Sequence, residues 1–288
     1  MKKFLSLMLV ALMLVASIGM LSSCGDDSII VQTNAFFAPF EYYDGDEIVG
    51  VDVEIMAKVG EKLGKTVKFD NVSFSAIIDN VKDGNVCDAG AAGITITDSR
   101  KEKVDFSIPY YTSVQYVIMP VGSTLATKTN ADGVEYMVWE ALTDKKIGVQ
   151  MDTTGYIYTD GEINAAADND YGYDGVLYGT NTTCTPFSTA QLAADAITAN
   201  QIDVVIIDEL PAQFIVSNNS NFKCVPLYYS GETDADDAPV EEQYAICVTK
   251  GNTELLNAIN EVLEELLVKD ENGVTAVEKM VMKHMGME

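Results

Sequence analysis

The chain has 288 residues, 48% of them hydrophobic, which is enough to bury one large core or two smaller ones. Its 44 acidic side chains outnumber 18 Lys and Arg residues, and the net charge of −26 argues against nucleic-acid binding, which needs clustered cations. The only arginine is Arg100 and the only histidine is His284. One histidine near the C-terminus excludes a multi-histidine zinc site and argues against histidine-based catalysis. We therefore expect no metal and no cofactor.

The first segment has the features of a signal peptide. Lys2 and Lys3 precede an apolar stretch from residue 4 to residue 21, and small residues then lead to Cys24. The stretch is also about long enough for an uncleaved membrane-spanning helix, but its end resembles the bacterial lipoprotein cleavage site. That resemblance implies that residues 1–23 are removed, that a lipid on Cys24 anchors the protein to the membrane, and that residues 24–28 form a short link. The mature protein is then extracytoplasmic, at the cell surface or in the periplasm.

In the rest of the chain, apolar runs typical of strands alternate with the apolar periodicity of helices. Strands are predicted at 29–31, 67–69, 86–92, 146–150 and 203–207, and helices from Asp52 to Leu63, at 74–81 and at 189–199. Asp52 is predicted to cap the first of these helices. The alternation predicts parallel sheets flanked by helices, and its recurrence from residue 146 predicts two such α/β units. The segment 158–184 is rich in Gly, Asp, Asn and Tyr and is expected to form an irregular surface loop.

Four cysteines follow Cys24, and export would permit them to form disulfide bonds in any of three pairings. Cys87 and Cys247 lie in apolar runs typical of buried residues. Cys184 and Cys224 have polar neighbours and are the better candidates for a disulfide. No Cys-x-x-Cys motif occurs, which argues against metal binding and redox catalysis.

Polar and aromatic residues gather where the predicted strands end. In an open parallel sheet, ligands bind outside the carboxyl ends of the strands. The residues at these positions are Asn34 and Phe37, then Gly93, Thr95 and Arg100, then Thr153 and Thr154, and finally Asp208. Two units that turn these strand ends toward each other would share a cleft with one cation, one anion, several hydroxyl groups and aromatic walls.

Several of these residues allow a structural interpretation as well as a functional one. The planar guanidinium of Arg100 suits a carboxylate ligand, although arginine is most often a surface residue. Asp208 follows four branched apolar residues and needs a partner such as an ammonium group, unless it caps the next helix. Thr153 and Thr154 are candidate helix caps, and the free N–H groups of a helix start also bind carboxylates. Phe37 and Phe74, taken alone, are typical of core residues.

Several motifs stand in order along the chain. They are Pro-Phe-Glu-Tyr at 39–42, Gly-Val-Asp-Val-Glu-Ile at 50–55, Ala-Gly-Ile-Thr-Ile-Thr-Asp-Ser-Arg at 92–100 and Val-Asp-Phe-Ser-Ile-Pro-Tyr-Tyr at 104–111, followed by Gly-Val-Gln at 148–150, Val-Ile-Ile-Asp at 205–208 and Tyr-Ala-Ile at 244–246. From about Ile29 onward this series resembles the extracellular solute-binding proteins, family 3, of polar amino-acid ABC transporters. The resemblance implies a two-lobed type II periplasmic-binding-protein fold, each lobe a mostly parallel sheet flanked by helices. It places lobe 1 at 29–112 and 243–288 and lobe 2 at 113–242, with two crossover strands near 111–114 and 240–244 as a hinge.

The resemblance also implies roles for individual residues. Arg100 corresponds to the arginine that binds the α-carboxylate of the ligand, with Thr95 and Thr154 as further donors. Gly93 and Asp208 correspond to the carbonyl group and the acid that bind the α-ammonium group. In addition, Phe37 and Phe74 would enclose the ligand side chain, and Asn34 and Gln150 would contact its tip.

The function implied is that of a monomeric, lipid-anchored receptor that binds an L-α-amino acid between two closing lobes and delivers it to an ABC permease. Asn34 stands where relatives that bind basic amino acids, or glutamine, carry an acid, which argues against lysine and arginine as ligands. Asn34, Gln150 and the two aromatic residues indicate a polar, neutral ligand such as glutamine or cystine. Asp152 stands where a glycine is usual. An enzyme on the same fold, such as an arogenate or cyclohexadienyl dehydratase that uses Asp152 as its acid, is one alternative. A sensory ligand-binding protein is another.

Overall fold

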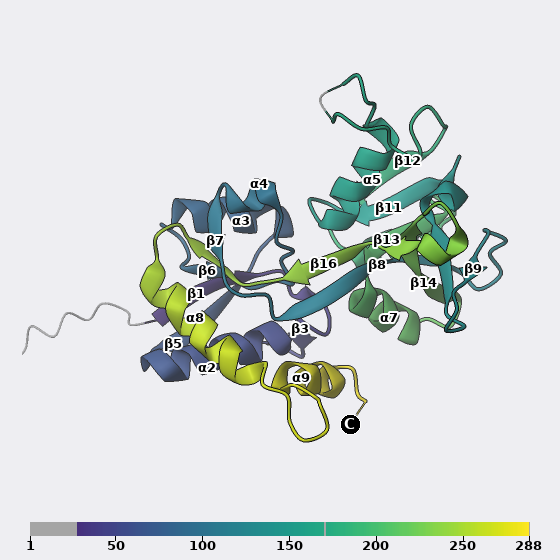
Figure 1. Cartoon of the computed structure of the whole chain (residues 1–288). Helices are drawn as coiled ribbons and strands as arrows, with labels where there is room; N and C mark the ends of the chain where they lie inside the picture. The colour runs from purple at the N-terminus through teal and green to yellow at the C-terminus, as the bar shows by residue number, and fades with distance from the viewer. Residues whose placement is uncertain (1–27, 170, 288) are drawn as a thin grey trace, which may run out of the picture.

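The structure is a computed structural model that describes residues 28–169 and 171–287. It consists of two α/β lobes that lie side by side and are joined by two strands, β8 (Tyr111–Pro120) and β16 (Glu241–Tyr244) (Figure 1). The predicted cleavage site and Cys24 lie outside the described residues. Within the described part of the chain, no helix has the length and hydrophobicity that crossing a bilayer requires.

Lobe 1 is built on a five-stranded sheet. Its strands, in spatial order, are β5 (Thr66–Asn71), β1 (Ser28–Thr33), β6 (Ala89–Gly90), β17 (Cys247–Thr249) and β7 (Val104–Phe106). The first three are parallel, as the strand and helix alternation predicts, and the last two extend the sheet in antiparallel fashion. The strand predicted at 86–92 is only two residues long, because the chain then leaves the sheet in a loop that borders the cleft before it returns to the same sheet as β7. A small separate sheet is formed by β2 (Phe36–Phe37), β3 (Glu41–Asp44) and β4 (Glu47–Val49).

Helices cover both faces of the lobe 1 sheet. They are α2 (Val51–Leu63), α3 (Phe74–Asp83), α4 (Asp98–Lys101), α8 (Thr253–Leu266) and α9 (Ala276–His284). Side chains of a strand alternate between its faces, so Ile29 and Val31 of β1 pack with α2 and α8, whereas Ile30 packs against the cluster around α3. The α8 and α9 helices come from the C-terminal part of the chain, which returns to lobe 1 after completing lobe 2 (Figure 1).

Lobe 2 is built on a nine-stranded mixed sheet. Its main order is β12 (Thr183–Phe187), β11 (Lys146–Gln150), β13 (Val204–Asp208), β8, β14 (Phe222–Tyr229), β10 (Glu135–Val138) and β9 (Lys128–Thr129), while β15 (Ala238–Pro239) pairs with β14 and β16 with β8. The strands β12, β11 and β13 are parallel, and β8 runs antiparallel to β13. Helices α6 (Ala190–Thr198) and α7 (Glu209–Ser217) pack on one face and α5 (Thr154–Asn164) on the other. Two short 3-10 helices, η1 (Trp139–Leu142) and η2 (Asp234–Asp236), complete the lobe.

The two connecting strands form an antiparallel pair between the lobes. Tyr244 pairs with Tyr111 and Glu241 with Val114, so both passages of the chain run next to each other in register. An aromatic cluster holds their lobe 1 ends, where the ring centroids of Phe40 and Tyr244 are 5.0 Å apart and those of Phe40 and Tyr111 are 5.2 Å apart. A two-stranded connection of this kind can bend as a unit, which is the arrangement found in hinge-closing proteins.

Asp52 does not cap α2, so this part of the sequence prediction is wrong. Gly50 precedes the helix, and Asp52 lies in its first turn with its side chain fully buried. The carboxylate accepts the N–H of Gly93 at 2.9 Å and the hydroxyl of Tyr110 at 2.5 Å. Burial raises the pKa of Asp52 to about 6. This acid therefore ties the start of α2 to the loop after β6, which leads into the cleft.

The segment 158–184 is more ordered than its composition predicts. The helix α5 continues to Asn164 and β12 begins at Thr183, which confines the irregular loop to residues 165–182. Glycine and threonine inside α5 have low helix propensity, and for this reason the composition indicates a loop. Within the loop, the N–H groups of Ala167 and Val176 donate to the side chains of Asp174 and Glu162. These bonds stabilise a loop that has little apolar core.

A disulfide between Cys184 and Cys224, the better candidates in the sequence, is ruled out by the sheet order. Cys184 lies on β12 and Cys224 on β14, and three strands separate them. With about 4.8 Å between neighbouring strands, the two residues are roughly 19 Å apart, whereas a disulfide requires Cα atoms within about 7 Å. All four cysteines in the described part of the chain are unpaired. Cys87 and Cys247 are buried, as the sequence predicts for apolar strand positions.

Candidate functional site

The carboxyl ends of the parallel strands in both lobes meet at a closed cleft. A small cavity there is lined by Phe37, Phe74, Gly93, Thr95 and Arg100 from lobe 1 and by Gln150, Thr153, Thr154 and Asp208 from lobe 2. These are nine of the ten ligand-contacting residues predicted from the sequence. The tenth, Asn34, is 4% exposed and lies beside the cavity, where its side chain contacts Gln150. The fold therefore brings together residues that are far apart in the chain.

Arg100 is a buried cation at the edge of this cavity, with only 6% of its surface exposed. The short helix α4 positions it, because the Thr97 hydroxyl caps this helix by accepting the N–H of Arg100. Its guanidinium donates to the carbonyl oxygens of Thr95 at 2.8 Å and Asp152 at 3.0 Å, and it lies 5.4 Å from the ring centroid of Phe74. Burial lowers the pKa of Arg100. No carboxylate of the described residues forms an ion pair with it, so the site favours an anionic partner.

Gly93 is the position at which the backbone of the cleft requires glycine. Its φ of 53° lies in the left-handed region, which side chains disfavour. A Cβ atom here would also lie 2.6 Å from a ring carbon of Phe37. The close approach places the Phe37 ring against the loop, and the hydrogen bond from the Gly93 N–H to Asp52 fixes the loop from the other side.

Asp208 ends β13 with only 2% of its surface exposed, and it does not cap α7 through its side chain. Gln115 of β8 donates to its carboxylate at 3.0 Å. Burial raises the pKa of Asp208 well above its usual range, and the negative charge of Glu242 raises it further. No lysine or arginine of the described residues forms an ion pair with Asp208. An ammonium group that enters the cleft would supply the missing positive charge.

The sequence interpretation missed two polar residues of the cleft, Glu242 and Gln115, which lie on the two connecting strands. Glu242 is 4% exposed and Gln115 is fully buried. The side-chain amide of Gln115 donates to both Asp208 and Glu242, and its carbonyl oxygen has no partner among the described residues. A signal for Glu242 is present in the sequence, because Glu242 stands two residues from Val240 and from Tyr244 and would share their face of a strand. The structure shows this alternation, with Glu242 and Tyr244 buried.

Direct contacts cross the cleft and hold the lobes together. The side-chain amide of Gln150 donates to the Asn34 carbonyl oxygen at 3.1 Å, and the hydroxyl oxygens of Thr95 and Thr154 are 3.3 Å apart. The bond from Arg100 to the Asp152 carbonyl also joins the two lobes. The cleft is therefore in a closed conformation.

Asp152 adopts the backbone conformation that glycine usually supplies at this position. Its φ is 61°, and its side chain is exposed. Asp152 does not line the cavity, and its backbone carbonyl is the acceptor for Arg100. The neighbouring Thr153 caps α5, as predicted, by accepting the N–H of Tyr156.

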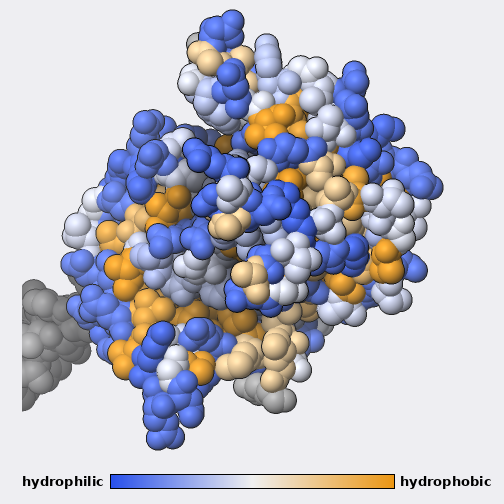
Figure 2. All heavy atoms as spheres, turned by 45° about the vertical axis from the view of Figure 1, so that its right-hand side comes forward, coloured by the Kyte–Doolittle hydropathy of each residue, from blue (hydrophilic) through white to orange (hydrophobic). Residues whose placement is uncertain are grey.

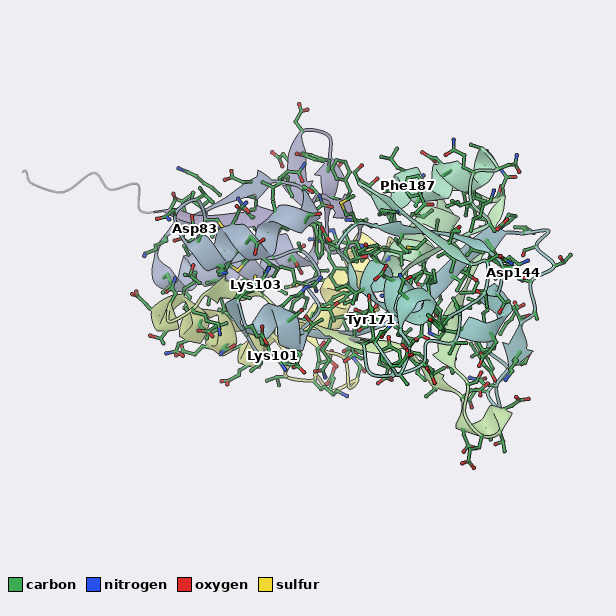
Figure 3. All side chains as sticks on the ribbon, turned by 90° about the horizontal axis from the view of Figure 1, so that it is seen from above. Asp83, Lys101, Lys103, Asp144, Tyr171 and Phe187 are labelled. Carbon is green, nitrogen blue, oxygen red and sulfur yellow. The ribbon has the colours of Figure 1, made fainter. Side chains whose placement is uncertain are left out.

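The mouth of the cleft is a wider groove beside Arg100. It is lined by Phe74, Ser75, Ile78, Asp79, Ser99, Arg100, Lys103, Asp152 and Ile157. Lys103 and Asp79 form an ion pair of 2.8 Å at its edge. Lys103 lies on the lobe 1 side of the molecule (Figure 3). On the face shown in Figure 2, hydrophilic side chains are interspersed with hydrophobic patches. Among residues 28–169 and 171–287, no group of three or more His, Cys, Asp or Glu side chains is arranged to hold a metal ion.

The two lobes are joined by a two-stranded connection and hold unmatched buried charges between them. This arrangement defines a hinged ligand-binding protein. The chain belongs to the bacterial extracellular solute-binding proteins, family 3, whose family model matches residues 29–273. Proteins of this family bind solutes outside the cytoplasm, and the relatives found are amino-acid-binding proteins of ABC transporters.

Similar proteins cover most of the chain. The arginine-binding extracellular protein of Bacillus subtilis (strain 168) is 26% identical over 252 residues, which are 88% of this chain and 84% of that protein. The L-cystine-binding protein of Escherichia coli (strain K12) is 23% identical over 240 residues, which are 83% of this chain and 77% of that protein. An ancestral arginine-binding protein bound to glutamine is similar in structure, with a TM-score of 0.69, 28% identity and coverage of 90% of this chain and 98% of that one. The fold is that of the type II periplasmic binding proteins, as predicted.

Proposed function

We propose that the cleft binds the zwitterion of an L-α-amino acid. The observation that carries this proposal is the pair of buried, unmatched charges: Arg100 without a carboxylate partner and Asp208 without a cationic one. A buried charge is costly unless an opposite charge and hydrogen bonds accompany it. The α-carboxylate would pair with Arg100 and the α-ammonium group with Asp208. One zwitterion therefore satisfies both.

The ligand side chain that we propose is polar and neutral, as in glutamine or cystine. It would lie between Phe37 and Phe74, with Asn34 and Gln150 at its tip. Those two amides present both donors and acceptors and carry no charge. The relatives include a protein named for arginine and one named for L-cystine. An ancestral arginine-binding protein has been solved with glutamine bound, so the family's arginine-type cleft is compatible with a neutral amide.

Calorimetric titration of the purified protein with each L-amino acid and with L-cystine tests this assignment. We expect binding of one or a few polar neutral amino acids, with much weaker heats for lysine and arginine. Mass spectrometry of any ligand that is retained through purification provides an independent identification. Preference for lysine or arginine would overturn the neutral-ligand assignment, and the absence of any amino-acid binding would overturn the proposed function itself.

We further propose that the lobes divide at the connecting strands, with residues 29–112 and 243–288 in lobe 1 and residues 113–242 in lobe 2. A ligand that contacts Arg100 on one lobe and Asp208 on the other stabilises the closed form, because only that form offers both contacts. The closed, monomeric protein would then be recognised by the permease of an ABC transporter. The dehydratase alternative receives no support, since the side chain of Asp152 is exposed and does not line the cavity.

The proposed location is outside the cytoplasmic membrane, with a lipid on Cys24 as the anchor. The basis is the sequence of the first 24 residues: two lysines, an apolar stretch and small residues before the cysteine. Growth of cells that express the full chain in the presence of labelled palmitate is expected to label the protein. The Cys24→Ala variant should remain unlabelled and leave the membrane fraction, and label that persists in this variant would exclude the assignment.

A further inference from the structure

Glu242 occupies a central place in the cleft. It lies on β16 between the lobes, and its side chain is 4% exposed. One carboxylate oxygen accepts the hydroxyl of Thr95 at 2.5 Å and also the hydroxyl of Thr154, and the other oxygen accepts the amide of Gln115. Thr95 belongs to lobe 1 and Thr154 to lobe 2. The carboxylate of Glu242 therefore bridges the two lobes.

The hydrogen-bond capacity of the two threonines limits what else they can bind. A threonine hydroxyl carries a single hydrogen atom, so it donates one hydrogen bond at a time. In the structure Thr95 and Thr154 both donate to Glu242. An ionised ligand carboxylate also accepts hydrogen bonds and cannot donate them. It can use these hydroxyl groups only after Glu242 has released them.

The charges around Glu242 lead to the same competition. Burial lowers the pKa of Arg100, and among its charged neighbours Glu242 does most to raise that pKa again. Asp208 carries a second carboxylate that shares the Gln115 amide with Glu242. A ligand carboxylate that reached the hydroxyls of Thr95 and Thr154 would lie close to the Glu242 carboxylate, because both hydroxyls contact it, and like charges repel.

We propose that Glu242 is an internal competitor of the ligand, whose carboxylate holds the two threonine hydroxyls that the α-carboxylate of an amino acid requires. Binding then exchanges one carboxylate for another, and Glu242 reduces the affinity of the cleft while stabilising the contact between the lobes. This inference depends on the proposed function, because it assumes a ligand that carries a carboxylate.

The variant Glu242→Gln tests the proposal with little change of shape. Its amide nitrogen donates to the threonine oxygens, which leaves the hydroxyl hydrogens free for the ligand. We expect the amino acids bound by the wild type to bind at least about tenfold more tightly in calorimetric titration, which is about 1.4 kcal/mol. Glu241→Gln is the matched control, because it removes the same charge from the exposed neighbour on the same strand and should leave affinity within about twofold. If Glu242→Gln does not fold, Glu242→Ala should change affinity in the same direction.

A double-mutant cycle with Thr154→Val separates release of the hydroxyl from a general loss of negative charge. If the freed hydroxyl of Thr154 binds the ligand, the gain from Glu242→Gln should fall at least threefold in the Thr154→Val background. An equal gain in both backgrounds, or affinity in Glu242→Gln that is unchanged or weaker, contradicts the proposal. Selective loss of lysine and arginine binding would instead make Glu242 a partner of a cationic ligand group. If neither the wild type nor any variant binds an amino acid, the proposed function fails together with this inference.

Discussion

Replacing Arg100 with lysine is expected to weaken amino-acid binding at least 30-fold. The guanidinium already donates to the carbonyl oxygens of Thr95 and Asp152 on opposite lobes, and its remaining N–H groups are available to a ligand carboxylate. Lysine keeps the positive charge but lacks the planar set of donors that can serve both tasks. Loss of one hydrogen bond to a charged group costs about 2 kcal/mol, which corresponds to a factor of roughly 30 in Kd.

The control for this prediction is Lys101→Arg, which exchanges the same two cations at the exposed neighbouring position of α4. It should leave the affinity unchanged in the same titration. If Arg100→Lys binds within about threefold of the wild type, the guanidinium is not the carboxylate partner.

The parts of the site that the sequence predicts are those set by the ends of strands. Asp208 follows a run of branched apolar residues, and a residue in that position must emerge at the carboxyl edge of the sheet. Gln150 ends its strand in the same way and in the position predicted. Since parallel strands of both lobes present the same edge, local patterns are sufficient to bring such residues together.

The features that the sequence did not predict depend on which strands become neighbours. Glu242 faces the cleft because β16 pairs with β8 in a register that places it opposite Ser113, and this pairing spans more than 120 residues of chain. The polar neighbours of Cys184 and Cys224 suggest a disulfide, but the strand order of the lobe 2 sheet places the two residues too far apart for one. Asp52 has the local features of a helix cap, but a hydrogen bond to the distant Gly93 determines where its side chain lies. Local propensity cannot anticipate these long-range contacts.

The acids of the cleft illustrate how function and stability oppose each other in this protein. Burial raises the pKa of Asp208, which means that its charged form is disfavoured in the folded state. Such a group lowers the free energy of unfolding as the pH rises from its pKa in the unfolded state to its raised pKa in the folded state. An acid that is retained in spite of this effect needs a partner that compensates for it, and the ammonium group of a ligand is a suitable one.

Asp208→Asn should therefore weaken amino-acid binding by about 30-fold or more. The same substitution should raise the thermal unfolding temperature at pH 7. Asparagine keeps the shape and can still accept the amide of Gln115, but it cannot neutralise an ammonium group. Its neutral side chain also removes the buried negative charge beside Glu242. Calorimetric titration and differential scanning calorimetry on the same samples measure the two effects.

The pH dependence distinguishes this role from a merely structural one. Because the pKa of Asp208 is raised, lowering the pH through that value protonates the carboxylate and should weaken binding in the wild type, whereas the affinity of Asp208→Asn should depend less on pH. Asp203→Asn, which makes the same substitution at the exposed residue just before β13, is the control and should bind as the wild type does. A variant at position 208 that is more stable and yet binds as tightly as the wild type would show that the ammonium group is held elsewhere. Weaker binding together with greater stability would identify Asp208 as a residue that destabilises the fold while it serves the ligand.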